Sequence, residues 1–237
     1  MKTNCAIIGY FDNLALFLEY NLSKYSNFKN KLFISYEKLP KNVSQKDKKF
    51  LTSNKVEFVK NNKLGKTKII YEKNFLPILK KNKIKNVFIA IGDGKIREKV
   101  FKIFNKTNIK VNSFIHPTAI LAGKNEIGKG CIIYPNTYLG YKVRINDCVK
   151  IQSSVTIEHH SFIDSFVDIN PGVVTGGNVR IGKFCELGLS STILNKVHIS
   201  ENCIIGAKSL VLKSIQKKNK IIYGIPGKIH EKKKNKN

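Results

Sequence analysis

The second half of the chain carries an aliphatic residue at every sixth position, and this period restricts the fold more than any other feature. The series runs from Ile127 to Val211, and only Thr175 interrupts it. An amphipathic helix needs a period of 3.6 residues and a half-buried strand a period of two, so neither explains the pattern. Short strands joined by turns do explain it, with three strands in a coil of about 18 residues. The sequence therefore predicts a parallel β-helix of roughly five coils.

The first half of the chain alternates between two other patterns. Apolar runs of strand length predict β-strands, and helix-spaced apolar residues predict helices between them. The expected strands lie at 5–9, 31–35 and 86–92, and the expected helices at 13–24 and 95–104. This alternation predicts a small Rossmann-like α/β domain.

The expected fold class is therefore α/β plus all-β. We place the Rossmann-like domain at 1–113, the β-helix at 114–229 and a disordered basic tail at 230–237. Residues 37–73 are rich in lysine and weakly periodic, and they predict loops with a short added hairpin.

The positive charge does not point to nucleic acid. The formal net charge is +27, but only three of the 43 basic residues are arginines: Arg97, Arg144 and Arg180. Proteins that read bases and phosphates usually use the planar fork of arginine. We expect a lysine-rich solvated surface that meets anionic small molecules, with no nucleic-acid partner.

The cysteines and the apolar runs indicate the class of protein. The five cysteines form no CxxC pair, so neither a zinc site nor a thioredoxin-like redox site is expected, and no metal is predicted. No apolar run approaches the roughly 18 residues of a membrane span, and the start of the chain predicts a strand rather than a signal peptide. The expectation is a cytoplasmic protein with free thiols and no membrane association.

Six motifs follow one another along the chain. They are FIAIGDGKIREKVF (88–101), FIHPTAIL (114–121), TIEHHSFIDSFVDINPG (156–172), GGNVRIG (176–182), IIGAKSLVLKSI (204–215) and YGIPGK (223–228). In this order they resemble the bacterial sugar O- and N-acetyltransferases that join a nucleotide-sugar-binding α/β domain to a left-handed hexapeptide β-helix. The resemblance implies an acetyl-CoA-dependent, homotrimeric N-acetyltransferase that acts on a nucleotide-linked amino sugar in surface-glycan biosynthesis.

The resemblance also implies a catalytic base. His159 matches the family histidine that deprotonates the acceptor amine, and a neutral imidazole suits that task near pH 7. His160 departs from the pattern, because the family usually places Asp or Glu there to orient the imidazole. Either His160 orients His159 less strongly, or a carboxylate of Glu158, Asp164 or Asp168 takes this part.

The expected coenzyme A residues follow from the same resemblance. Asp168 stands where some relatives have a histidine that contacts the thioester region of acetyl-CoA, and a solvated turn residue is the equal alternative. Gly177, Leu189 and Ala207 match positions along the pantetheine arm, and Gly206 and Lys208 flank them. The segment from 223 to 228 is expected near the adenine end.

The expected acceptor site lies after the strands of the first domain. Relatives carry a GxxGH turn after the first strand, and here Gly9 is kept while Asp12 and Asn13 stand in the remainder of the turn. Ser35 and Tyr36 replace the acidic pair expected after the second strand. Gly92 belongs to the AIGDG turn at 90–94, which keeps the form that this turn has in the family.

Two other functions stay open at this point. The protein could be a sugar O-acetyltransferase of the sialic-acid type, since a histidine base serves a hydroxyl as well as an amine. It could also be a non-catalytic solenoid that binds a partner. The sequence identifies neither the nucleotide, nor the sugar, nor the acyl group.

Overall fold

The computed structural model describes residues 2–9, 13–35, 59–60, 63–64, 67–71 and 74–231. These residues form two compact units. The first unit comprises Met1–Gly92 and Lys102–Asn112, and the second comprises Asp93–Phe101 and Ser113–Asn237. The expected boundary at 113 falls next to the observed junction, but residues 93–101 group with the second unit.

The first unit contains a sheet in which seven strands are described. Its order is β3-β4-β5-β2-β1-β6-β7, and the pairs from β5 to β7 are parallel, whereas β3, β4 and β5 pair antiparallel. The strands are β1 (Thr3–Gly9), β2 (Phe28–Ser35), β3 (Val59–Lys60), β4 (Lys63–Leu64), β5 (Thr67–Tyr71), β6 (Asn86–Ala90) and β7 (Lys110–Val111). The central strand β1 is buried on both faces, which explains its continuous apolar run.

The helices of the chain are short and amphipathic. In α1 (Asn13–Tyr25), Leu14, Leu18 and Leu22 recur at a spacing of four and are buried. Pro77 stands in the first turn of α3 (Leu76–Lys81). In α4 (Gly94–Phe104), the side chain of Asp93 accepts hydrogen bonds from the N–H groups of Lys95 and Ile96, so it caps the helix.

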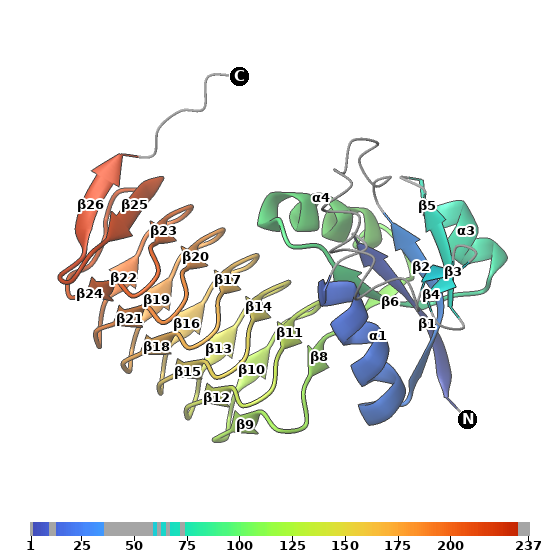
Figure 1. Ribbon diagram of the computed structural model, residues 1–237, viewed down its shortest axis with the longest axis horizontal. Coiled ribbons are helices and arrows are strands. Elements are labelled where there is room, and N and C mark those ends of the chain that lie inside the picture. The colour runs from blue at the N-terminus through green and yellow to red at the C-terminus, as the bar shows by residue number, and fades with distance from the viewer. Residues whose placement is uncertain are drawn as a thin grey trace. The chain divides into compact units, whose positions relative to one another are not determined.

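The second unit is the predicted solenoid of parallel β-strands (Figure 1). Two-residue strands, three to a coil, pair with the strands 18 residues away, as Ile133 pairs with Ile151. The structure has about six coils, one more than predicted, because β8 and β9 continue the period back to Ile115 and Leu121. These two aliphatic side chains are more than a third exposed, since the first coil has a neighbouring coil on one side only.

The strands of the solenoid form three sheets, which we call faces 1, 2 and 3. Face 1 contains β8 (Phe114–Ile115), β11 (Ile132–Ile133), β14 (Lys150–Ile151), β17 (Asp168–Ile169), β20 (Glu186–Leu187), β23 (Ile204–Ile205), β25 (Lys220–Tyr223) and β26 (Lys228–Glu231). Face 2 contains β9 (Ile120–Leu121), β12 (Tyr138–Leu139), β15 (Thr156–Ile157), β18 (Val174–Thr175), β21 (Thr192–Ile193) and β24 (Leu210–Val211). Face 3 contains β10 (Glu126–Ile127), β13 (Arg144–Ile145), β16 (Phe162–Ile163), β19 (Arg180–Ile181) and β22 (His198–Ile199).

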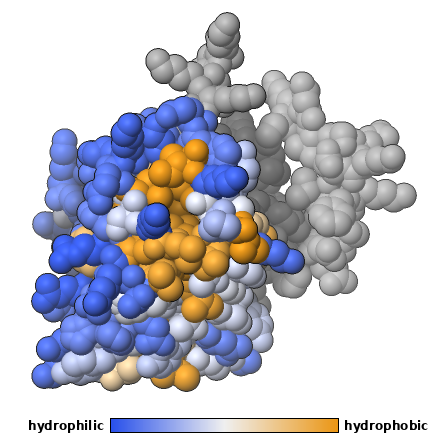
Figure 2. Space-filling view, turned by 90° about the vertical axis from the view of Figure 1, so that its left-hand side faces the viewer, coloured by the Kyte–Doolittle hydropathy of each residue, from blue (hydrophilic) through white to orange (hydrophobic). Residues whose placement is uncertain are grey.

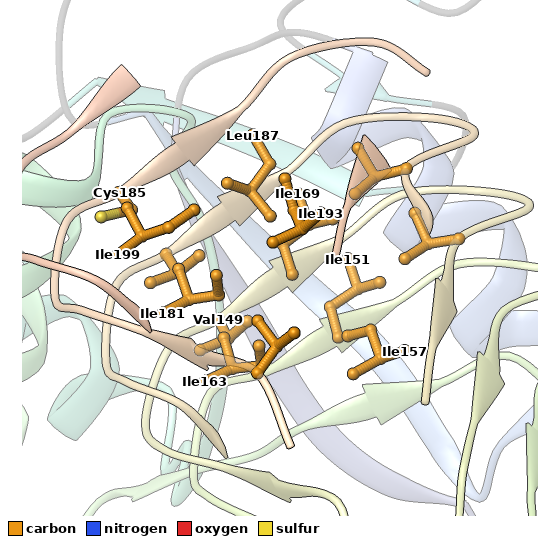
Figure 3. Packing of buried hydrophobic residues seen from close by; sticks show 14 of the residues in the cluster. Val149, Ile151, Ile157, Ile163, Ile169, Ile181, Cys185, Leu187, Ile193 and Ile199 are labelled. Atoms are coloured by element: carbon orange, nitrogen blue, oxygen red, sulfur yellow. The ribbon is translucent and has the colours of Figure 1, made fainter. Parts of the chain in front are cut away.

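The aliphatic lattice is the core of the solenoid (Figure 3). Ile151, Ile169 and Leu187 stack on face 1 with no exposed surface. Cys131, Cys185 and Cys203 share this interior. All five cysteines of the chain are free and buried, and burial raises the pKa of the Cys131 thiol to about 12. They act as small apolar core residues.

A second lattice of period six fixes the corners. From Lys124 to Lys208, every sixth residue has a positive φ, and most of them are not glycine. From Lys142 onward, each such residue donates its N–H to a carbonyl of the preceding coil, as His160 does to Tyr141 O at 2.9 Å. These coils therefore stack in register at their turns.

The last coil ends in a hairpin of β25 and β26, which includes His230 and Glu231 of the expected tail. Residues 232–237 lie outside the described residues. Figure 2 shows apolar atoms gathered at this end of the solenoid, where Leu212, Ile225 and Ile229 are exposed. No helix that the structure describes has the length and apolar character to cross a bilayer.

Candidate functional site

The two predicted catalytic histidines lie at the turn that follows β15, between faces 2 and 3. We call the stacked turns at 141–142, 159–160 and 177–178 the histidine corner. Nδ1 of His159 lies 3.0 Å from Nδ1 of His160, and both side chains are exposed. Gly177 lies one coil further along, and a Cβ there would meet Cε1 and Nε2 of the His159 ring at 2.6 Å. The imidazole thus packs on the backbone of Gly177, and a larger residue there would require the ring to move.

The contact between the two rings requires complementary tautomers. Two Nδ1 atoms at hydrogen-bond distance require one N–H and one lone pair. When His159 donates from Nδ1, its Nε2 carries the lone pair and is able to accept a proton. His160 then accepts at Nδ1 and holds its own proton at Nε2. In that arrangement His160 lies where it can orient the His159 ring, whereas Asp164 accepts a hydrogen bond from Asn146.

A basic groove of about 480 Å³ begins at His160 and runs along face 3. Its charged lining consists of Lys124, Lys142, Arg144 and Arg180 against a single carboxylate, Glu126. Ser161 and Phe162 complete the lining. Sequence reasoning did not assign the two arginines to a site. The available signal was their rarity in a chain whose other basic residues are nearly all lysines.

Four of the predicted coenzyme A residues come together at another corner. Leu189, Ala207 and Lys208 lie at the turns between faces 1 and 2, which we call the leucine corner, and Gly206 directly precedes them. Lys208 N–H donates to Leu189 O at 2.7 Å, so the two turns are stacked. Leu189 is 53% exposed, and Ala207 and Lys208 are also exposed. Gly177 belongs to the histidine corner, across face 2.

Asp168, expected near the thioester of acetyl-CoA, takes part in two ion pairs. Its carboxylate lies on face 1, 3.0 Å from the guanidinium of Arg97 and 3.3 Å from the ammonium of Lys150. Arg97 is 2% exposed and also donates to Cys148 O at 2.9 Å. The pair joins the first turns of α4 to the solenoid, and the structure does not bring Asp168 to the histidine corner.

The predicted acceptor residues of the first unit lie at the carboxyl ends of parallel strands. Gly9 ends β1 and is in register with Ser35 of β2 and Ala90 of β6. A Cβ at Gly9 would come 1.9 Å from Ala90 O, so this position requires glycine. Gly92 follows β6 and Asn13 begins α1. Asp12 and Tyr36 lie outside the described residues.

The hairpin at the end of the solenoid contains the segment expected near adenine. The Tyr223 ring stacks on the His230 ring at 3.9 Å and 7°. The part of the chain that the structure describes contains no group of three His, Cys, Asp or Glu side chains that could hold a metal ion.

Comparison with solved structures identifies the fold. Perosamine N-acetyltransferase from Caulobacter crescentus, solved with CoA and GDP-perosamine, matches with a TM-score of 0.80 over 96% of this chain and 97% of its own, at 18% identity. The acetyltransferase domain of PglB from Neisseria gonorrhoeae FA1090, solved with acetyl coenzyme A, matches with a TM-score of 0.76 at 18% identity over 97% of this chain and all of its own. The chain has the fold of bacterial sugar N-acetyltransferases. The resemblance drawn from the six motifs is thus confirmed at the level of the fold.

The sequence comparisons cover less of the chain. No family model matches it. Bifunctional protein GlmU of Clostridium novyi (strain NT) is 36% identical over 76 residues, which is 30% of this chain and 16% of that protein. The chain therefore matches only about a sixth of the length of this curated relative.

Proposed function

We propose that the protein is an acetyl-CoA-dependent N-acetyltransferase that acts on a nucleotide-linked amino sugar. The observation that carries the proposal is the His159 imidazole, held between Gly177 and the Nδ1 of His160, on a fold shared with perosamine N-acetyltransferase. With His159 as the Nδ1 donor of the pair, its Nε2 is the proposed base at an exposed corner.

The proposed reaction moves two protons from the sugar nitrogen. The sugar ammonium releases the first to solvent and reaches the site as the free amine. The amine attacks the carbonyl carbon of the thioester and gives its second proton to Nε2 of His159. The tetrahedral oxyanion collapses, the C–S bond breaks, and the imidazolium protonates the departing thiolate. A positioned base of this kind contributes about 10²–10⁴-fold to the rate. His160 holds the ring but brings no negative charge to the imidazolium.

The turn beneath His159 offers a donor for the oxyanion. The backbone N–H of Gly177 donates to no other described residue, whereas the adjacent N–H groups of Gly176 and Asn178 bond to Ile193 O and His159 O. A free N–H next to the base suits the stabilisation of charge that develops on the thioester oxygen.

The leucine corner supports a site for coenzyme A. Small or exposed residues at Gly206, Ala207 and Leu189 allow a pantetheine arm to approach the backbone. The leucine and histidine corners lie on opposite edges of face 2, where Ile120 and Val174 expose apolar side chains. We propose a homotrimer in which the leucine corner of one copy meets the histidine corner of another.

The first unit is proposed as the Rossmann-like domain that receives the nucleotide. The carboxyl ends of β1, β2 and β6 meet there, which is where parallel sheets bind ligands. We propose a cytoplasmic role in surface-glycan biosynthesis, consistent with the substrate class.

The test is turnover with a panel of acceptors. The protein is incubated with acetyl-CoA and UDP-, GDP- or dTDP-linked amino sugars, and release of free CoA thiol is followed. We expect thiol release with at least one of them and an N-acetylated product by mass spectrometry. Silence across the panel with activity on sialic acids would replace the proposal with O-acetylation.

The role of His159 has a matched control in the same solenoid. His159→Ala should abolish thiol release while the oligomer and its circular dichroism stay unchanged. His198→Ala, at an exposed histidine of β22, should retain full activity. Equal activity of the two variants would remove His159 as the base.

A further inference from the structure

The groove on face 3 holds more positive charge than the proposed chemistry uses. Lys142 lies at the histidine corner and Lys124 at the turn one coil before it, and Arg144 and Arg180 lie on β13 and β19. Glu126, the single carboxylate of the lining, already pairs with Arg144 at 3.3 Å. The remaining cations have no carboxylate within the groove.

The identity of the cations is informative as well as their number. Of the 43 basic residues only three are arginines, so a solvated patch in this chain would be expected to contain lysine. Two of the three line this groove, and the third, Arg97, is buried in an ion pair. Guanidinium groups match the planar geometry of carboxylates and phosphates better than ammonium groups do.

The spacing of the arginines suits convergence on one ligand. Arg144 and Arg180 are both in register with Phe162, which lies on the strand between them. Adjacent strands are about 4.8 Å apart, so the two arginine backbones are roughly 10 Å apart. Two side chains of this length can reach a common oxyanion above the aromatic ring.

We propose that this groove binds an oxyanion carried by the acceptor, either a carboxylate on the sugar or a phosphate of its nucleotide. This inference rests on the proposed function, because it places the acceptor beside His159. The groove begins at His160, whereas the expected coenzyme A residues cluster at the leucine corner on the far edge of face 2. The acceptor thus reaches the histidine pair along face 3.

A binding experiment tests the groove without turnover. Protein labelled with ¹⁵N-arginine should give three Nε–Hε signals in an NMR correlation spectrum, assigned with Arg144→Gln and Arg180→Gln. On titration with inorganic pyrophosphate or with glucuronate, the signals of Arg144 and Arg180 should shift saturably. The buried Arg97 serves as the internal reference and should not move.

The arms of the titration separate the sources of the oxyanion. Saturation by pyrophosphate alone indicates a phosphate of the nucleotide, and saturation by glucuronate indicates a carboxylate on the sugar. Shifts no larger than those produced by sodium chloride at equal ionic strength would overturn the proposal. Displacement of the bound anion by acetyl-CoA would also overturn it, because the groove would then serve the acyl donor.

A kinetic arm applies once an acceptor is found. Arg180→Gln should raise the KM for the acceptor by roughly 10- to 100-fold, the range for losing a charged hydrogen bond, and leave the KM for acetyl-CoA unchanged. Lys196→Gln removes the same charge from an exposed turn outside the groove lining and should change neither. An unchanged acceptor KM in Arg180→Gln would refute the groove assignment. Failure of every acceptor would count against the proposed function, whereas the NMR result would still decide the groove.

Discussion

Removal of Arg97 should destabilise the second unit strongly. The guanidinium is 2% exposed and donates to Asp168 and to Cys148 O. Deleting one partner of a buried ion pair costs about 3–5 kcal/mol, because the other charge stays buried. Asp168 keeps Lys150 at 3.3 Å and is 17% exposed, so the expected loss in Arg97→Ala lies near the lower end, at about 3 kcal/mol.

The assay is thermal unfolding followed by circular dichroism. For a chain of this size, about 3 kcal/mol corresponds to a fall in Tm of roughly 6–12 °C. Lys99→Ala, at an exposed position of the same helix, is the control and should leave the Tm nearly unchanged. In a double-mutant cycle with Asp168→Asn, the two losses should be clearly less than additive.

The result also decides between two roles for Asp168. A structural ion pair predicts that Asp168→Asn lowers the Tm and leaves the KM for acetyl-CoA unchanged. If Asp168→Asn raised that KM at an unchanged Tm, or if Arg97→Ala behaved like Lys99→Ala, the reasoning from the buried pair would be refuted.

Three further predictions concern the site, the core and the corners. Gly177→Ala would place a Cβ 2.6 Å from the His159 ring, so kcat should fall about 100-fold at a nearly unchanged Tm. The control Asn195→Ala, at the next turn, should keep its activity. An unaffected kcat in Gly177→Ala would contradict the packing of this ring. Burial raises the pKa of Cys5 and Cys131 to about 12. At pH 8, native protein should therefore react with a thiol reagent far more slowly than unfolded protein. Rapid labelling before unfolding would show that these thiols are accessible. Ser154 has a φ of +57°, a conformation that a β-branched residue adopts poorly. Ser154→Val should therefore lower the free energy of unfolding in urea by about 1–2 kcal/mol, whereas Ser154→Gly should not lower it. Equal losses in the two variants would refute the argument from backbone strain at the corners.

The sequence anticipated most of the solenoid because its period is local. Each aliphatic residue meets its equivalent 18 residues away, so a repeat read along the chain describes the packing directly. The predicted series began at Ile127, although Ile115 and Leu121 continue the same period of six at the open end. Left-handed winding stays an expectation from the family resemblance.

The candidate site could be predicted only in part. The histidine pair, Gly177 and the residues of the leucine corner lie at turns, as their spacing in the repeat indicated. The environment of Asp168 could not be predicted, because its partner Arg97 is 71 residues away on α4. No periodicity relates a helix to the strand on which it packs.

The sequence by itself determined the period, and with it the coil, the inward aliphatic positions and the turns on which polar groups stand. The tertiary structure alone decided which turns share a corner and which outward side chains meet on a face. Stacking of coils brings residues 18 and 36 positions apart into one groove, as with Arg144 and Arg180 on either side of Phe162. Charge and ligand geometry depend on such distances through space, whereas the repeat depends only on distance along the chain.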